Sequence, residues 1–113
     1  MSDYVFVYIT VASPEQAVEI GRALVEARLA ACANVLPGAT AVYWWEGAVR
    51  QDSEAVLVAK TRAGLARAVV DKVREIHTYA CPCVVCLPIV AGNPAFLDWI
   101  GAETRPGGGE AAD

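Results

Sequence analysis

The only histidine of the chain and three of its four cysteines lie close together, in the order His77, Cys81, Cys83 and Cys86. Imidazole and thiolate groups are ligands that suit Cu(I) and Zn²⁺. The spacing matches no standard zinc motif. Because Pro82 biases the residue before it toward an extended backbone, Cys81 and Cys83 should share one face of a strand, whereas Cys86 points to the other face. If this segment binds a metal, the arrangement that fits best is a two-thiol site at Cys81 and Cys83 that a neighbouring subunit completes.

Each of these residues also has a purely structural interpretation. Free cysteine is often buried and packs as a small hydrophobe, and this applies to Cys32 as well as to the other three. His77 falls at the end of a predicted helix, where an imidazolium interacts favourably with the helix dipole. A Cys–His nucleophilic pair would need an orienting third group and an oxyanion pocket, and the sequence indicates neither. We therefore expect a protein that is not an enzyme, with metal ligation and simple packing both open.

A second set of candidates could bind a small anionic metabolite in a cleft; it comprises Trp45, Lys60, Arg62 and Tyr79. Trp44 and Trp45 are adjacent, so in a strand they face opposite ways, and one of them could line such a cleft. Asp52 and Glu54 lie near the two cationic residues in the sequence. A solvated edge of ion pairs is therefore the alternative interpretation of Lys60 and Arg62.

The elements that would position these residues begin with a strand and a helix. Residues 4–12 are a run of β-branched and aromatic residues, typical of a strand that is buried on both faces. The segment Ser13-Pro14-Glu15-Gln16 then provides an N-cap, a proline at the first helical position and a capping box. Helical spacing continues to about residue 31. The apolar residues that keep this spacing are Val18, Ile20, Leu24, Val25 and Leu29.

The second half of the pattern contains a hairpin and a second helix. Pro37-Gly38 predicts a turn. Two long strands follow within residues 41–61, joined near Gln51-Asp52-Ser53, with a bulge at Gly47. The remaining predicted elements are a helix capped by Thr61 that continues to His77, a strand over 83–90, and a short helix that starts at Asn93-Pro94.

This order predicts an α+β fold, the ferredoxin-like βαββαβ arrangement with a short C-terminal helix. It forms a single domain over residues 1–104, followed by a disordered tail over 105–113. Right-handed crossovers place both long helices on one face of the sheet. Strands 4–12 and 54–60 are nonetheless apolar on both faces, and 56% of the 113 residues are hydrophobic, more than one small core needs. Copies of the same chain are the simplest cover for the second face, so we expect a homo-oligomer.

Charge and composition exclude several classes of partner. The formal net charge of −4 argues against nucleic-acid binding and against a basic membrane-binding face. No apolar run approaches the roughly 18–20 residues of a membrane-spanning helix, and the first residues lack the features of a signal peptide. We therefore expect a cytosolic protein without a membrane role, whose cysteines are thiols rather than disulfides.

Two known functions of ferredoxin-like proteins do not fit this sequence. Tyr4, Phe6 and Tyr8 lie on one strand face, as in RNA-recognition domains, but the partner strand 54–60 begins with an acidic residue and contains no aromatic one. Small acyl-phosphate hydrolases need an anion-binding arginine after the first strand. Residues 10–14 contain no arginine and no glycine-rich cradle. Both interpretations are rejected on these grounds, since the fold by itself does not decide function.

Several motifs follow one another at the spacing of one known family. The most specific are Trp44-Trp45-Glu46-Gly47 and Gly92-Asn93-Pro94. Others are Leu29-Ala30-Ala31-Cys32-Ala33-Asn34-Val35-Leu36-Pro37-Gly38, Asp52-Ser53-Glu54, Lys60-Thr61-Arg62, His77-x-Tyr79, Leu87-Pro88-Ile89 and Leu97-x-Trp99-Ile100. From about residue 4 to 101 the chain closely resembles the divalent-cation tolerance family, CutA. The resemblance implies a tightly packed ferredoxin-like homotrimer, similar in outline to the PII regulatory proteins, and an association with copper and other divalent metals.

One departure from the family pattern bears on the metal. Where the family usually reads His-x-Tyr-Glu-x-Pro-Glu, this chain reads His77-Thr78-Tyr79-Ala80-Cys81-Pro82-Cys83. Both carboxylates are absent, and Cys83 stands in the place of the second, which favours softer metals. Together with the resemblance, the sequence leads us to expect a non-enzymatic homotrimer that binds or senses a divalent metal, with copper or zinc as the ion and an unidentified protein partner. The alternative is a PII-like signalling module that binds a small anionic metabolite between subunits.

Overall fold

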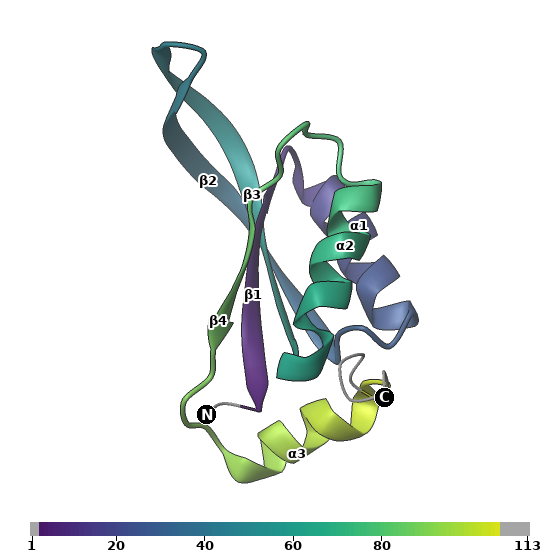
Figure 1. Cartoon of the computed structure of the whole chain (residues 1–113). Coiled ribbons are helices and arrows are strands. Elements are labelled where there is room, and N and C mark those ends of the chain that lie inside the picture. Colours follow the sequence, from purple (N-terminus) through teal and green to yellow (C-terminus); the bar gives the residue numbers. More distant parts are fainter. Residues whose placement is uncertain (1–2, 107–113) are drawn as a thin grey trace.

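Four antiparallel strands form one sheet in the order β2-β3-β1-β4, and the computed structural model describes residues 3–106 of the chain (Figure 1). Helices α1 and α2 cover one face of this sheet, and α3 lies across its lower end. In chain order the elements are β1 (Tyr4–Val11), α1 (Pro14–Glu26), β2 (Cys32–Trp45), β3 (Ala48–Arg62), a 3₁₀ turn (Ala63–Leu65), α2 (Ala66–Ile76), β4 (Val84–Pro88) and α3 (Pro94–Glu103). The predicted ferredoxin-like α+β fold is confirmed.

The core lies between the sheet and the two long helices. Val7, Ile9 and Leu57 are fully buried on the helix-covered face, where they meet Leu24 of α1 and Val69 of α2. No helix within residues 3–106 is long and apolar enough to cross a membrane.

The opposite sheet face is uncovered in the single chain. We call it the open face; its apolar members include Phe6, Tyr8, Leu36, Val85 and Leu87. These side chains are between 37% and 50% exposed, although strand residues of this type are usually buried. The first strand is therefore buried on one face only within a single chain, and its other face requires a cover from outside the chain.

Helix α1 ends earlier than the apolar spacing predicted. Arg28 adopts a left-handed conformation, with φ 62°, and the amide of Leu29 donates to the carbonyl of Leu24 at 2.9 Å. These features form a Schellman cap, which usually contains glycine and for that reason left no signal here. Leu29 still reaches the core, but from the loop. Val18 and Val25, which keep the helical spacing in the sequence, lie on the exposed flank of the helix.

The hairpin turns at a different place from the predicted one. Glu46 and Gly47 have φ angles of 51° and 80°, which makes them the two central residues of a tight turn between β2 and β3. Asp52 and Ser53 lie in the middle of β3 rather than in a turn. The predicted turn at Pro37-Gly38 is instead a bulge inside β2, where the register shifts between Leu36 and Ala39.

Two smaller predictions were also wrong. Thr61 does not cap the second helix; it is buried at the end of β3, and its hydroxyl is a buried side-chain oxygen without a hydrogen-bond partner in the described chain. Strand β4 covers 84–88 rather than 83–90, although single hydrogen bonds to β1 continue on both sides of it, from the Ile89 amide to the Tyr4 carbonyl at 3.0 Å and from the Thr10 amide to the Cys83 carbonyl at 3.3 Å. Of the predicted tail, the amide of Arg105 donates to the carbonyl of Arg28 at 3.0 Å, whereas residues 107–113 lie outside the described residues.

Candidate functional site

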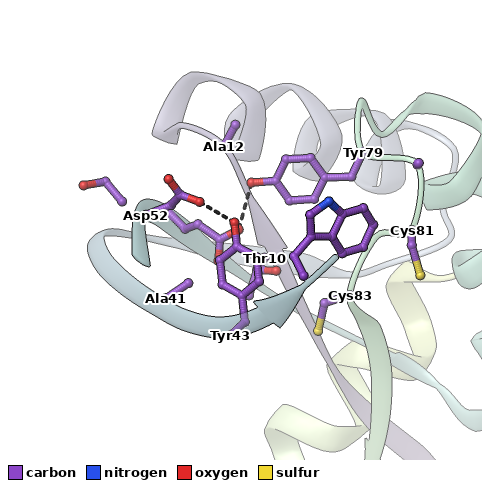
Figure 2. Close-up of a pocket in the computed structure, with 12 residues that line it drawn as sticks. Thr10, Ala12, Ala41, Tyr43, Asp52, Tyr79, Cys81 and Cys83 are labelled. Carbon is purple, nitrogen blue, oxygen red and sulfur yellow. Dashed lines mark hydrogen bonds between the residues drawn. The ribbon is translucent and has the colours of Figure 1, made fainter. Parts of the chain in front are cut away.

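A cleft of about 580 Å³ lies between the β2–β3 hairpin, the end of β1 and the loop that connects α2 to β4 (Figure 2). Its walls combine aromatic, acidic and thiol side chains. The lining residues are Thr10, Ala12, Ala41, Tyr43, Trp45, Asp52, Ser53, Glu54, Tyr79, Ala80, Cys81 and Cys83.

The bulge in β2 decides which side chains reach this cleft. Before it, Leu36 pairs with Val56; after it, Ala39 pairs with Glu54, so that β2 has advanced by one residue more than β3. One extra residue moves every later side chain of a strand to the opposite face. Tyr43 and Trp45 consequently lie on the same face as Glu54, and Trp44 points away with 74% of its surface exposed.

Two tyrosine–carboxylate pairs lie in the cleft. The Tyr79 hydroxyl donates to Glu54 Oε2 at 2.8 Å, and the Tyr43 hydroxyl donates to Asp52 Oδ2. Burial, reinforced by the hydrogen bond to Glu54, raises the pKa of Tyr79 to about 12. The hydrogen bond to Asp52 raises the pKa of Tyr43 above its ordinary value. Both rings are thus held in place as neutral phenols beside carboxylates.

The ionisation of Tyr79 provides a direct measurement of this pairing. We expect the tyrosine ultraviolet titration to contain a step near pH 12 that Tyr79→Phe removes, and Glu54→Gln should move it toward 10. Because the pKa is raised in the folded state, the contribution of this group to stability is complete below about pH 10 and is lost as the pH rises through 12. Tyr8→Phe on the open face is the control and should leave the step in place. A step that survives Tyr79→Phe contradicts the assignment.

The sole histidine positions the cleft loop rather than facing the cleft. His77 is 8% exposed, its Nε2 lies 2.8 Å from the carbonyl oxygen of Thr10, and its Nδ1 accepts the Tyr79 amide at 3.1 Å. An accepting Nδ1 places the proton on Nε2, which donates to Thr10. Both nitrogens of a neutral ring are therefore engaged. Within this chain the imidazole is therefore not available to a metal. It is also not the charged group at the helix end that was predicted as its structural role.

The four predicted metal ligands do not assemble within one chain. Cys81 and Cys83 are exposed and line the cleft together. Cys86 shares a sheet face with Val7 and packs against the core, where burial raises its thiol pKa. Within residues 3–106, no three His, Cys, Asp or Glu side chains are grouped so as to hold one ion. None of the four cysteines, Cys32 among them, forms a disulfide within the described chain.

The four residues predicted to bind an anionic metabolite do not lie together. Trp45 and Tyr79 line the cleft, but Lys60 lies six residues from Glu54 along β3, a separation of about 20 Å. Lys60 donates to Asn34. Arg62 donates to the carbonyl of Gly101 and, at 3.0 Å, to the hydroxyl of Thr104, so it fastens α3 to the sheet. None of the described lining residues is basic.

Sequence reasoning missed Tyr43, Asp52 and Glu54 as members of the site. The signal was present: acidic residues at positions i and i+2 of a strand lie on one face. It was overlooked because Asp52 was assigned to a turn.

The strand order, the two helices on one face and the open opposite face define a ferredoxin-like α+β protein with a ligand-sized cleft beside its hairpin. Residues 5–103 match the family of the CutA1 divalent ion tolerance protein. The chain belongs to this family, which confirms the resemblance seen in the sequence.

Relatives cover most of the chain. It is 45% identical over 98 residues to the divalent-cation tolerance protein CutA of Thermus thermophilus, a match that covers 87% of this chain and 95% of the relative. It is 41% identical over 101 residues to the chloroplastic CutA 1 of Oryza sativa; this match covers 89% of this chain but only 57% of that relative, so the chain spans little more than half of its length. The crystal structure of CutA1 from Oryza sativa superposes with a TM-score of 0.89 at 39% identity and covers 92% of this chain and 95% of that one.

Proposed function

We propose that this chain is a non-enzymatic, homotrimeric metal-binding protein that takes up a soft ion, copper foremost, through Cys81 and Cys83. The observation that carries the proposal is the placement of these two exposed thiols in one cleft. Thiolates select Cu(I) and Zn²⁺ over harder cations. The Thermus thermophilus relative is named for divalent-cation tolerance, which supports a role with metals.

The donor set of one chain fits a soft ion but does not complete its coordination. Zinc usually takes four ligands, and the cleft offers two thiols, with Asp52 and Glu54 held by tyrosines. The remaining ligands would come from a neighbouring subunit. The open face supports such an assembly, because Phe6, Val85 and Leu87 need a cover and three copies can provide it mutually.

The surroundings of His77 argue against a cysteine–histidine nucleophile in this chain. A cysteine nucleophile needs a nearby base. His77, the only histidine, has both ring nitrogens occupied by Thr10 and Tyr79. A cytosolic location and a protein partner remain predictions.

The metal proposal is tested by metal analysis of the untagged, reduced protein after incubation with Cu(I) or Zn²⁺. We expect stoichiometric metal that is lost in the double variant Cys81→Ser/Cys83→Ser. The matched control is Cys32→Ala/Cys86→Ala, which removes two thiols outside the cleft and should retain the metal. Full loading of the Cys81→Ser/Cys83→Ser variant would show that the thiol site is wrong.

The alternative of an anionic metabolite receives less support from the structure. Asp52 and Glu54 make the cleft acidic, and Lys60 and Arg62 lie away from it. Under that alternative, nucleotides or organic acids would raise the melting temperature, and Lys60→Ala would remove the effect.

A further inference from the structure

We propose that the cleft binds a small organic ammonium ion, held by the aromatic faces of Tyr43, Trp45 and Tyr79 and by the carboxylates of Asp52 and Glu54. The proposed metal site uses the thiols of Cys81 and Cys83, whereas the ammonium site uses only aromatic and acidic side chains of the cleft. The two proposals are therefore independent.

The shape of the cleft suits a small organic molecule. Its volume of about 580 Å³ lies in the range of pockets that hold such ligands. Tyr43 and Trp45 come from β2, and Tyr79 comes from the loop after α2. Figure 2 shows Tyr43 and Tyr79 approaching from different sides, with their hydroxyls directed toward the carboxylates. Aromatic side chains therefore enclose the cleft from more than one direction.

The charge of the cleft favours a cation. Aromatic faces carry the negative part of the ring quadrupole and attract ammonium groups. Asp52 and Glu54 add formal negative charge, and no described lining residue is basic. The phenol hydroxyls donate hydrogen bonds to these carboxylates and do not neutralise their charge. The negative charge therefore lies among the aromatic side chains that line the cleft. Such a site attracts a cation and repels the anionic metabolites considered above.

The cation should have an apolar surface rather than a hydration shell. Proteins commonly recognise alkylated ammonium groups with aromatic side chains. The methyl groups contact the ring faces, and the positive charge of the ammonium group is attracted to the same faces. A hard metal ion instead needs several oxygen ligands. Asp52 and Glu54 belong to no group of three potential ligands within residues 3–106.

The rings are already held in position before any ligand arrives. Tyr79 is fixed at its hydroxyl by Glu54 and at its amide by His77, whose ring packs against it with centroids 4.7 Å apart. Tyr43 is fixed at its hydroxyl by Asp52. A cage ordered in this way loses little conformational entropy when it binds a ligand.

The test is isothermal titration of the metal-free, reduced, full-length protein with choline and with tetramethylammonium. The neutral carbon analogue of choline, 3,3-dimethylbutan-1-ol, has nearly the same shape without the charge. We expect saturable binding of both cations and binding of the neutral analogue that is at least roughly tenfold weaker. Acetate should not bind.

Variants locate the site and separate it from the metal proposal. Trp45→Ala and Glu54→Gln should each weaken choline binding roughly tenfold. Trp99→Ala is the matched control, because Trp99 on α3 is 41% exposed, close to the 46% of Trp45, but lies outside the cleft. Cys81→Ser/Cys83→Ser should lose metal and keep choline binding, so the two proposals fail separately.

Three results would overturn this inference. The first is the absence of saturable choline binding, and the second is equal binding of the neutral analogue, which would make the cleft merely hydrophobic. The third is a structure of the assembly in which a lysine or arginine of a neighbouring subunit fills the cleft. That side chain has the same chemistry as the proposed ligand, and its presence would leave no room for a free cation.

Discussion

Substitution of Val85 by Asp is expected to abolish self-assembly and leave single folded chains. Val85 lies on β4 in the open face, opposite Tyr8 of β1, and is 49% exposed when the chain is alone. In a single chain the new carboxylate would remain in water and cost little. In a homotrimer that covers the open face it would be buried three times, and each unpaired buried charge costs several kcal/mol. The substitution therefore destabilises the assembled trimer but not the folded single chain.

The measurement is the molar mass in solution from light scattering. The wild-type protein should show three times the chain mass of 11.9 kDa, and Val85→Asp should show a single chain. The matched control is Val18→Asp, because Val18 is 50% exposed but lies on α1, on the helix side of the sheet. Far-UV circular dichroism verifies that the variants fold, and Leu87→Asp repeats the test at a second open-face position. If both open-face variants keep the wild-type mass, this face is not the interface.

The element order could be predicted from the sequence because it rests on strong local signals. The Ser13-Pro14 helix start and the apolar run of the first strand appear in the structure as Ser13 capping α1 and as β1. The errors arose where backbone conformation depends on a single unusual residue. Arg28 ends α1 in a left-handed conformation that is usually left to glycine, and Glu46 takes the same region in the hairpin turn. An arginine or a glutamate in the sequence does not indicate a left-handed conformation.

The site was less predictable than the fold, because register decides which side chains meet. Trp45 and Tyr79 were expected to line a cleft, and both do. The acidic pair Asp52 and Glu54 was missed because the bulge at 36–39 and the true turn together move it opposite the tyrosines. Lys60 was assigned to the cleft on proximity in sequence. A strand rises by about 3.3 Å per residue, so six residues carry it far from Glu54.

Replacement of His77 by Leu is expected to lower the free energy of unfolding by about 2–6 kcal/mol. The leucine fills a similar volume but leaves the carbonyl of Thr10 and the amide of Tyr79 without the partners that His77 provides. A part-buried polar group that loses its partner costs about 1–3 kcal/mol, and two such groups are affected. The loop that carries Tyr79 and Cys81 into the cleft would lose its anchor to β1. Urea unfolding at one fixed protein concentration measures the change, because the stability of an oligomer depends on concentration.

Two conservative variants divide the effect between the ring nitrogens. His77→Asn can keep an acceptor near Nδ1 for the Tyr79 amide, and His77→Gln can keep a donor near Nε2 for Thr10. Each should lose about half as much stability as His77→Leu. The ionisation of Tyr79 then distinguishes positioning from simple packing: its pKa should stay near 12 in His77→Asn and fall toward 10 in His77→Leu. If both variants leave the pKa of Tyr79 unchanged, His77 contributes only to packing, and the carboxylate of Glu54 alone holds the cleft tyrosine.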